Sequence, residues 1–125
     1  MSQKTIKIMG WSLTTILGAL FVFSAFLKLS QNSTALAQAA AFGFNQTTYL
    51  LIGIIEITSL VLFIIPRTGV LGTLLLVAYL GGAIVTHLQH QQPIVMPVVV
   101  QIILWITAVI RFPELRLRLF NKPKV

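Results

Sequence analysis

No charged residue lies between Arg67 and Arg111, which are separated by 43 uncharged residues. A helix needs about 20 mainly apolar residues to cross the hydrocarbon core of a bilayer, so this run is too long for one crossing. The polar segment 87–93 divides the run, because its glutamines, histidines and final proline are typical of a turn. The run therefore predicts two membrane-spanning helices joined by a short polar hairpin.

Two further stretches of the chain are similarly poor in charge. Ile8–Leu27 contains 20 residues without a charge, and Tyr49–Ile65 contains 17 residues interrupted only by Glu56. An isolated strand would leave its backbone groups unpaired in lipid, so each stretch is expected to be a helix. We therefore predict a single all-α domain, a membrane-spanning up-down four-helix bundle. Its spans are expected near residues 8–28, 48–65, 70–86 and 94–110.

The composition agrees with a membrane protein and excludes other classes. Hydrophobic residues make up 57% of the chain and charged residues 9%, against about 25% charged residues in a typical soluble domain. Disordered chains are poor in apolar residues and rich in charge, so disorder is excluded as well. The chain has no cysteine, which excludes disulfides, zinc–thiolate sites, iron–sulfur clusters and a thiol nucleophile.

An even number of spans puts both termini on the same side of the membrane. If that side is the cytoplasm, the outer side holds only one basic residue, Lys28. The basic residues on the cytoplasmic side are Lys4, Lys7, Arg67, Arg111, Arg116, Arg118, Lys122 and Lys124. This asymmetry follows the positive-inside rule and predicts an inner-membrane protein with cytoplasmic termini. Because these cations are spread over three segments, the net charge of +7 indicates contact with anionic lipid headgroups and no nucleic-acid partner.

The connections between the spans give weaker signals. After the first span, Asn32 or Ser33 is expected to cap a short helix over 35–41, which Gly43 would end. After the fourth span, Pro113 suits the first turn of a short helix at the membrane surface, although the alternating leucines and arginines fit an extended tail equally well. The first apolar run is longer than the roughly 7–15 residues of a signal peptide, so we expect this helix to be retained.

Glu56 is the one acidic residue inside the predicted spans. A charged side chain at the centre of a membrane helix costs about 2.5–3.5 kcal/mol on insertion scales, and such residues often have functions. With a rise of about 1.5 Å per residue, Gln101 of the fourth span reaches the same depth and is the expected hydrogen-bond partner. Two interpretations stay open. The carboxyl group binds a ligand or a proton, or it only ties helices together through hydrogen bonds.

Polar and aromatic residues of all four spans recur at helical spacing near the depth of Glu56. We expect their shared faces to surround a polar cavity that opens toward the outer leaflet and binds a ligand or couples protons. These candidate site residues are Glu56, Gln101, Trp105, Tyr79, Thr86, His87, Ser24 and Lys28. No catalytic residue and no metal ligand is predicted among them.

Each candidate also has a structural explanation. Lys28 ends the first span, and anchoring of its side chain among the lipid headgroups is favoured over pairing with Glu56. His87 and His90 have the spacing to share a metal ion, but without a nearby acid they are better explained as solvated loop residues. Trp105 is expected to pack in the core. Small residues let helices approach closely. That packing role is expected for Gly53, Gly72, Ala78, Gly81 and Gly82.

Several stretches of the chain carry a further signal. They are FSAFLKL at 23–29, GIIEI at 53–57, IPRTGVLG at 65–72, YLGGA at 79–83, Thr86-His87, and WITAVIR at 105–111. In this order they resemble the DoxX-like family of small four-helix bacterial membrane proteins, over most of residues 13–112. Two positions depart from the family pattern, since Ala25 replaces a common glycine and Gln89 replaces a common basic residue. The second departure argues against anion binding at the outer hairpin.

The resemblance implies a location in the bacterial cytoplasmic membrane and a link to redox processes. The family name derives from a subunit associated with quinone-linked oxidation of sulfur compounds, and relatives are linked to redox stress. A quinone is therefore one candidate cofactor. A membrane redox complex and further copies of the chain are candidate partners. The Glu and Thr-His positions that the family shares correspond to Glu56, Thr86 and His87, but no catalytic residue set carries over.

Three classes of function remain open. The favoured one is a non-catalytic membrane subunit or a binding protein for a lipophilic small molecule. The alternative is a small proton-coupled efflux transporter that uses Glu56. Small multidrug resistance transporters are also four-helix chains with one membrane-embedded Glu, but their Glu lies in the first helix. A redox enzyme acting alone is less favoured, because it would need a borrowed cofactor.

Overall fold

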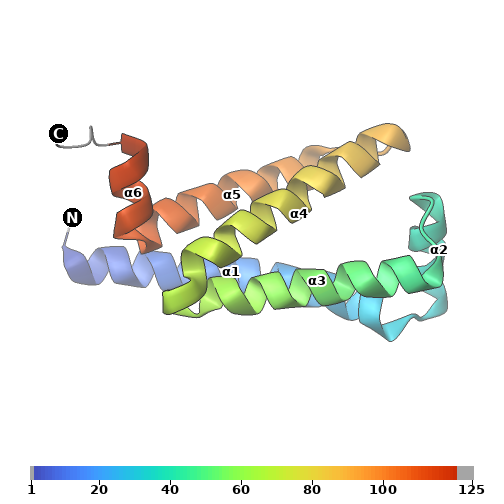
Figure 1. Ribbon diagram of the computed structural model, residues 1–125, viewed down its shortest axis with the longest axis horizontal. Coiled ribbons are helices and arrows are strands. Elements are labelled where there is room, and N and C mark those ends of the chain that lie inside the picture. The colour runs from blue at the N-terminus through green and yellow to red at the C-terminus, as the bar shows by residue number, and fades with distance from the viewer. Residues whose placement is uncertain (1, 121–125) are drawn as a thin grey trace.

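The structure, a computed structural model, describes residues 2–120 of the chain. Helices make up nearly all of this part (Figure 1). The α-helices are α1 (Gln3–Ser30), α2 (Ser33–Ala41), α3 (Gln46–Ile64), α4 (Gly69–Gln89), α5 (Val95–Arg111) and α6 (Pro113–Phe120). A short 3₁₀ turn, η1 (Pro66–Thr68), connects α3 to α4. Within residues 2–120 there is no strand, so the all-α prediction is confirmed.

Asparagine side chains cap the two helices that follow α1. The Asn32 side chain accepts a hydrogen bond of 2.8 Å from the Ala35 N–H, and the Asn45 side chain accepts one of 2.8 Å from the Thr48 N–H. These bonds satisfy backbone donors that a helix leaves unpaired in its first turn. Beyond the end of α2, Gly43 has a φ of +75°, which glycine adopts at little cost. The predicted short helix after the first span is therefore confirmed.

Three helical segments are long and apolar enough to cross a membrane, namely α1, α3, and α4 together with η1. The 17-residue α5 meets the same criteria only when it is joined to α6, from which it is bent by 105°. The bend follows Phe112, and α6 begins with a proline in its first turn. Each of the four predicted spans overlaps one long helix. After the fourth predicted span the chain forms a short helix, α6, not an extended tail.

The prediction that the polar hairpin starts at His87 is wrong. Helix α4 continues to Gln89, and the His90 N–H still bonds to the Thr86 carbonyl at 3.2 Å. Histidine and glutamine are tolerated in a helix, and the first residue that cannot donate a backbone hydrogen bond is Pro93. His87 therefore lies in the last turn of a helix and is half-buried.

The four long helices surround one apolar core. Helix α1 packs against α3 and α5, and α4 packs against the same two helices. The core contains Leu17, Phe21, Leu60, Phe63, Leu76, Leu80, Val100, Leu104, Ala108 and Phe112. Helices α4 and α5 diverge from α1 and α3 toward one end of the molecule, which is the end that carries α2 (Figure 1). The helices are therefore closely packed at one end of the molecule and splayed at the other.

Glycines account for two of the closest contacts between helices. A Cβ atom at Gly72 of α4 would overlap the backbone of Phe63 in α3, and a Cβ at Gly53 would lie 2.8 Å from the Lys28 Cβ. The packing role predicted for Gly81 and Gly82 is wrong, because a Cβ at either position meets nothing within 4 Å. The helices have already diverged where these two glycines occur.

Arg111 holds the closely packed end together. Its guanidinium donates hydrogen bonds to the carbonyls of Phe63 (2.9 Å) and Ile64 (3.0 Å), at the end of α3. The same group lies over aromatic rings, 4.5 Å from the ring centre of Trp11 and 4.7 Å from that of Phe112. Arg111 therefore satisfies carbonyls that a helix leaves unpaired at its C-terminus and links α3 to α5.

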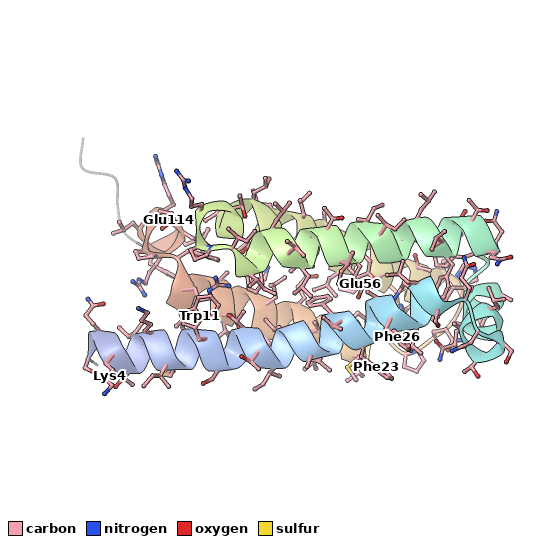
Figure 2. The ribbon with its side chains drawn as sticks, turned by 90° about the horizontal axis from the view of Figure 1, so that it is seen from below. Lys4, Trp11, Phe23, Phe26, Glu56 and Glu114 are labelled. Atoms are coloured by element: carbon pink, nitrogen blue, oxygen red, sulfur yellow. The ribbon has the colours of Figure 1, made fainter. Side chains whose placement is uncertain are left out.

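The outer surface of the helices is apolar. Phe23 and Phe26 point away from the core of the molecule in Figure 2, with 65% and 61% of their surface exposed. Many other large apolar side chains are exposed, on all four long helices. In water such a surface would be a large hydrophobic patch, whereas in a bilayer these side chains face lipid.

Candidate functional site

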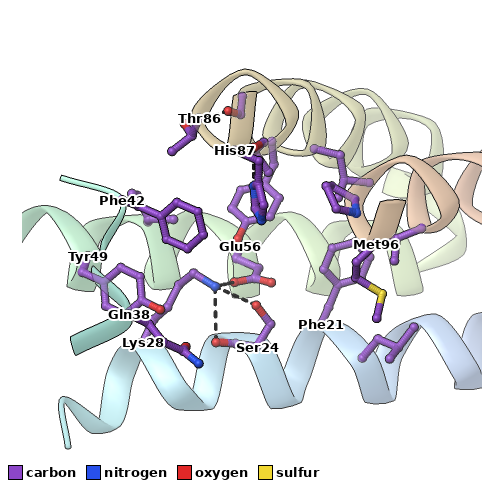
Figure 3. Close-up of a pocket in the computed structure, with 18 of the residues that line it drawn as sticks. Phe21, Ser24, Lys28, Gln38, Phe42, Tyr49, Glu56, Thr86, His87 and Met96 are labelled. Atoms are coloured by element: carbon purple, nitrogen blue, oxygen red, sulfur yellow. Dashed lines mark hydrogen bonds and ion pairs between the residues drawn. The ribbon is translucent and has the colours of Figure 1, made fainter. Parts of the chain in front are cut away.

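A buried ion pair joins α1 to α3 at the splayed end. The Lys28 ammonium lies 3.1 Å from the Glu56 carboxylate, and the two side chains are 12% and 1% exposed. Both come from helix positions that face the interior, and Gly53, one turn before Glu56, lets the stem of Lys28 approach α3. The expectation that Lys28 anchors in the lipid headgroups is wrong, since its side chain turns inward (Figure 3).

The Lys28 ammonium has further partners besides the carboxylate. It donates a hydrogen bond of 2.6 Å to the Ser24 hydroxyl and one of 3.4 Å to the Ser24 carbonyl, one turn earlier in α1. It also lies 5.6 Å from the ring centre of Tyr49 and 6.0 Å from that of Tyr79. Aromatic faces attract a desolvated cation. Three helices, α1, α3 and α4, thus supply the surroundings of one ammonium group.

Two buried side-chain oxygens within residues 2–120 accept no hydrogen bond of good geometry, namely Gln101 Oε1 and Glu56 Oε2, the oxygen that forms the ion pair with Lys28. The structure contains no hydrogen bond between these two residues, so the predicted Glu56–Gln101 partnership is wrong. Equal depth in the membrane does not fix the direction in which a side chain points around its helix. Lys28 pairs with Glu56 because its long stem reaches the carboxylate and its charge compensates it.

The ion pair lies in a cavity of about 590 Å³ between the diverging helices. The walls come from α1, α3, α4 and the start of α5, and α2 with its following turn closes one side. Aromatic side chains are the commonest large groups in the wall: Phe21, Phe23, Phe42, Phe44, Tyr49 and Tyr79. A mostly apolar cavity with a few convergent polar groups is typical of a small-molecule site.

Most of the predicted site residues line this cavity. They are Ser24, Lys28, Glu56, Tyr79, Thr86 and His87. Two predicted residues, Gln101 and Trp105, are absent from the lining and are half-buried elsewhere on α5.

Sequence reasoning missed the residues that the α2 segment contributes to the cavity. Gln38, Phe42 and Phe44 line it, and so does Met96 at the start of α5. The two phenylalanines flank the left-handed Gly43, which turns the chain back over the cavity. An aromatic–Gly–aromatic sequence after a short helix was the available signal, but it does not show which way the turn folds.

His87 meets the α2 segment at the rim of the cavity. Its ring centre lies 4.7 Å from that of Phe42, and its Nδ1 is 2.6 Å from the Ala83 carbonyl. A carbonyl accepts only, so Nδ1 carries the hydrogen, and Nε2 of the neutral ring is an acceptor. His90 makes the same kind of bond, with Nδ1 3.0 Å from the Thr86 carbonyl. Within residues 2–120 no three His, Asp or Glu side chains are grouped as a metal site.

Comparison with known proteins gives one match. The sequence profile of the DoxX-like family matches residues 12–109 of the chain, which is well over half of its length. No curated protein and no solved structure matches the chain. The matched range contains both residues of the ion pair and the whole cavity wall.

Proposed function

The chain belongs to the DoxX-like family, and from this premise we propose that it is a non-catalytic membrane protein that binds a lipophilic small molecule. The observation that carries the proposal is the cavity of about 590 Å³ with the Lys28–Glu56 pair in its wall. Such a volume falls in the range of small-molecule sites. An apolar wall suits a ligand that partitions into the bilayer, and the ion pair provides a polar point that orients it.

The charges in the cavity support an uncharged ligand. The Lys28 ammonium and the Glu56 carboxylate compensate each other, and a third charge would enter an apolar site without a counter-ion, which is costly. A quinone is the candidate we favour. Its flat ring suits the aromatic walls, its carbonyls accept hydrogen bonds, and its chain is soluble in lipid. The redox association of the family agrees with this choice.

Proton-coupled efflux through Glu56 is the weaker proposal. A carboxyl group that exchanges protons and substrate must be free to lose its partner in each cycle. Glu56 instead lies against the Lys28 ammonium, which is itself held by Ser24. Proton-gradient-dependent export by the purified protein in liposomes, abolished by Glu56→Gln, would favour the transporter over the binding protein.

We also propose four spans with cytoplasmic termini in the bacterial inner membrane. The start of α1, the η1 turn and α6 lie at the same end of the molecule (Figure 1). That end carries the basic residues Lys4, Lys7, Arg67, Arg111, Arg116 and Arg118. Their clustering supports placing this end in the cytoplasm by the positive-inside rule. Partners from a membrane redox complex, or further copies of the chain, would then contact the lipid-facing helices.

The binding proposal is tested by the lipids that copurify with the protein. The chain would be purified from bacterial membranes in mild detergent, and the extracted quinones quantified by mass spectrometry per mole of protein. Ala83→Trp fills the cavity from α4, whereas Ala78→Trp adds the same side chain to an exposed position on the same helix. We expect bound quinone in the wild type and in Ala78→Trp, and its loss in Ala83→Trp.

Two outcomes would contradict the proposal. One is a wild-type protein that carries no more quinone or other lipophile than an unrelated membrane protein purified in the same way. The other is retention of the ligand by a folded Ala83→Trp variant, which would place the ligand outside the cavity.

A further inference from the structure

We propose that the ligand enters the cavity sideways from the lipid, through an opening between α1 and the start of α5. Its hydrocarbon tail stays in this opening while its uncharged head lies in the cavity. The inference rests on the proposed binding function and specifies two further properties. One is the route of entry, and the other is the ligand class, a tailed molecule dissolved in the leaflet at the splayed end.

The polar groups in the cavity wall pair with one another. The Lys28 ammonium donates a hydrogen bond of 2.6 Å to the Ser24 hydroxyl and lies 3.1 Å from the Glu56 carboxylate. The Tyr79 hydroxyl donates a hydrogen bond to the same carboxylate. Because these groups have partners within the protein, no charged head is needed to balance them. The rest of the wall is mainly apolar and aromatic, which suits a molecule from the lipid phase.

Three large apolar residues belong both to the cavity wall and to the lipid-facing surface. They are Leu20 and Phe23 of α1 and Met96 of α5, with 41%, 65% and 66% of their surface exposed. Met96 lies beside Phe21, on the far side of the cavity from Lys28 (Figure 3). Both helices are proposed to cross the bilayer, so an opening flanked by these residues faces lipid. A hydrocarbon tail in it stays out of water along its whole length.

Two other routes into the cavity are less suited to such a molecule. Toward α3, the lining residues Tyr49 and Glu56 are almost fully buried. Toward α2, the half-buried Phe42 packs against His87 with ring centres 4.7 Å apart, and the exposed lining residue Gln38 is polar. An apolar chain would lose contact with lipid on either route. The side between α1 and α5 therefore fits a lipophile best.

The position of the tail is tested with a decylubiquinone analogue whose tail ends in a photoreactive diazirine. The full chain would be irradiated with this probe in lipid nanodiscs, and mass spectrometry of the digest would locate the labels. Phe26 of α1 and Val95 of α5 are matched controls, because they are about as exposed as Phe23 and Met96 but do not line the cavity. We expect labels on Phe23 and Met96 above the level of the controls, and their loss in Ala83→Trp.

Two labelling patterns would overturn the inference. Equal labelling of Phe23 and Phe26 that is unchanged in Ala83→Trp would show contact with bulk lipid only. Labels around Gly82 of α4 that disappear in Ala83→Trp would place the tail on another side of the cavity. The second pattern would leave the proposed binding function intact.

The route of entry is tested with a block that can be removed. Because the chain has no cysteine, Met96→Cys has a single thiol beside the opening, and benzyl methanethiosulfonate converts this thiol to a bulky mixed disulfide. Val95→Cys, modified in the same way, is the control on the same helix. Mass spectrometry would follow the exchange of bound decylubiquinone for a deuterated copy in nanodiscs. We expect modification to slow this exchange severalfold in Met96→Cys only, and dithiothreitol to restore it.

The exchange experiment separates the failure of this inference from the failure of the proposed function. Recovery after reduction shows that a slowed exchange does not come from misfolding. An exchange rate in Met96→Cys that modification leaves unchanged would overturn lateral entry, while the bound ligand would still support the proposed function. A wild-type protein that binds no decylubiquinone and copurifies with no lipophile would overturn both.

Discussion

Lys28 and Glu56 illustrate how two residues that are each unfavourable in lipid become acceptable together. Moving a charge into an apolar medium costs several kcal/mol, and attraction to an opposite charge recovers this only with good geometry and further hydrogen bonds. Here the ammonium has the carboxylate at 3.1 Å and the Ser24 hydroxyl at 2.6 Å. Removal of one partner alone therefore leaves an uncompensated buried charge, while removal of both does not.

This coupling gives a stability prediction for single residues. Lys28→Met should lower the free energy of unfolding by about 3 kcal/mol, the usual cost of breaking one side of a buried pair. The double variant Lys28→Met with Glu56→Gln should be more stable than Lys28→Met alone, because no buried charge remains. Reversible unfolding in mixed detergent micelles would measure both. Effects of the two substitutions that simply add would contradict a coupled pair.

At the scale of elements, the glycines of α4 divide the helix into two halves with different surroundings. Gly72 lies where α4 meets the backbone of α3 around Phe63, and a residue with a Cβ atom would not fit there. Gly81 lies where α4 has diverged from its neighbours, and a Cβ would have open space. Glycine inside a helix is unfavourable by about 0.5–1 kcal/mol relative to alanine, so of Gly72 and Gly81 only Gly72 has a packing reason for this cost.

Alanine substitutions at these two glycines should therefore act in opposite directions. Gly81→Ala should raise the free energy of unfolding by about 0.5–1 kcal/mol, through the higher helix propensity of alanine. Gly72→Ala should lower it by about 1–3 kcal/mol, because the added methyl group pushes α3 and α4 apart. Thermal unfolding in detergent would compare them on the same helix. A stabilising Gly72→Ala would disprove the close contact between α3 and α4.

At the scale of the whole molecule, the two ends of the helices differ in packing and charge. Arg111 and the rings around it hold α3 and α5 together at the end with α6. The opposite end is splayed, contains the cavity and is covered by α2. A closely packed end with basic residues suits the cytoplasmic headgroup layer, and the proposed topology places the splayed end toward the outer leaflet.

The absence of cysteine from the chain allows a direct test of this orientation. Single cysteines at Gln92 and Thr47, which are exposed at the splayed end, should react with a membrane-impermeant maleimide in intact spheroplasts. A cysteine at the exposed Gln3, at the start of α1, should react only after the membrane is opened. The reverse labelling pattern would show that the basic end faces outward and would refute the proposed topology.

The sequence alone determined where the long helices lie along the chain and that they are apolar enough to lie in a lipid bilayer. Apolar runs between charges define where the four long helices lie, because a backbone in lipid must satisfy its own hydrogen bonds and a helix does so locally. Short-range signals were also readable, such as Asn32 as a helix cap and Gly43 beyond the end of α2. Depth along the helices was enough to bring Ser24, Tyr79 and Thr86 into the same site as Glu56.

Only the tertiary structure decided which of these residues pair and where space remains. The equal depth of the two residues in the membrane predicted Gln101 as the partner of Glu56. The direction in which a side chain points from its helix, however, depends on how the helices rotate and splay. That rotation is set by contacts distant in sequence, such as Arg111 with Phe63, 48 residues apart. The pairing of Lys28 with Glu56 and the cavity beside it are consequences of this packing. No local pattern in the sequence encodes them, because their energies arise only when separate helices meet.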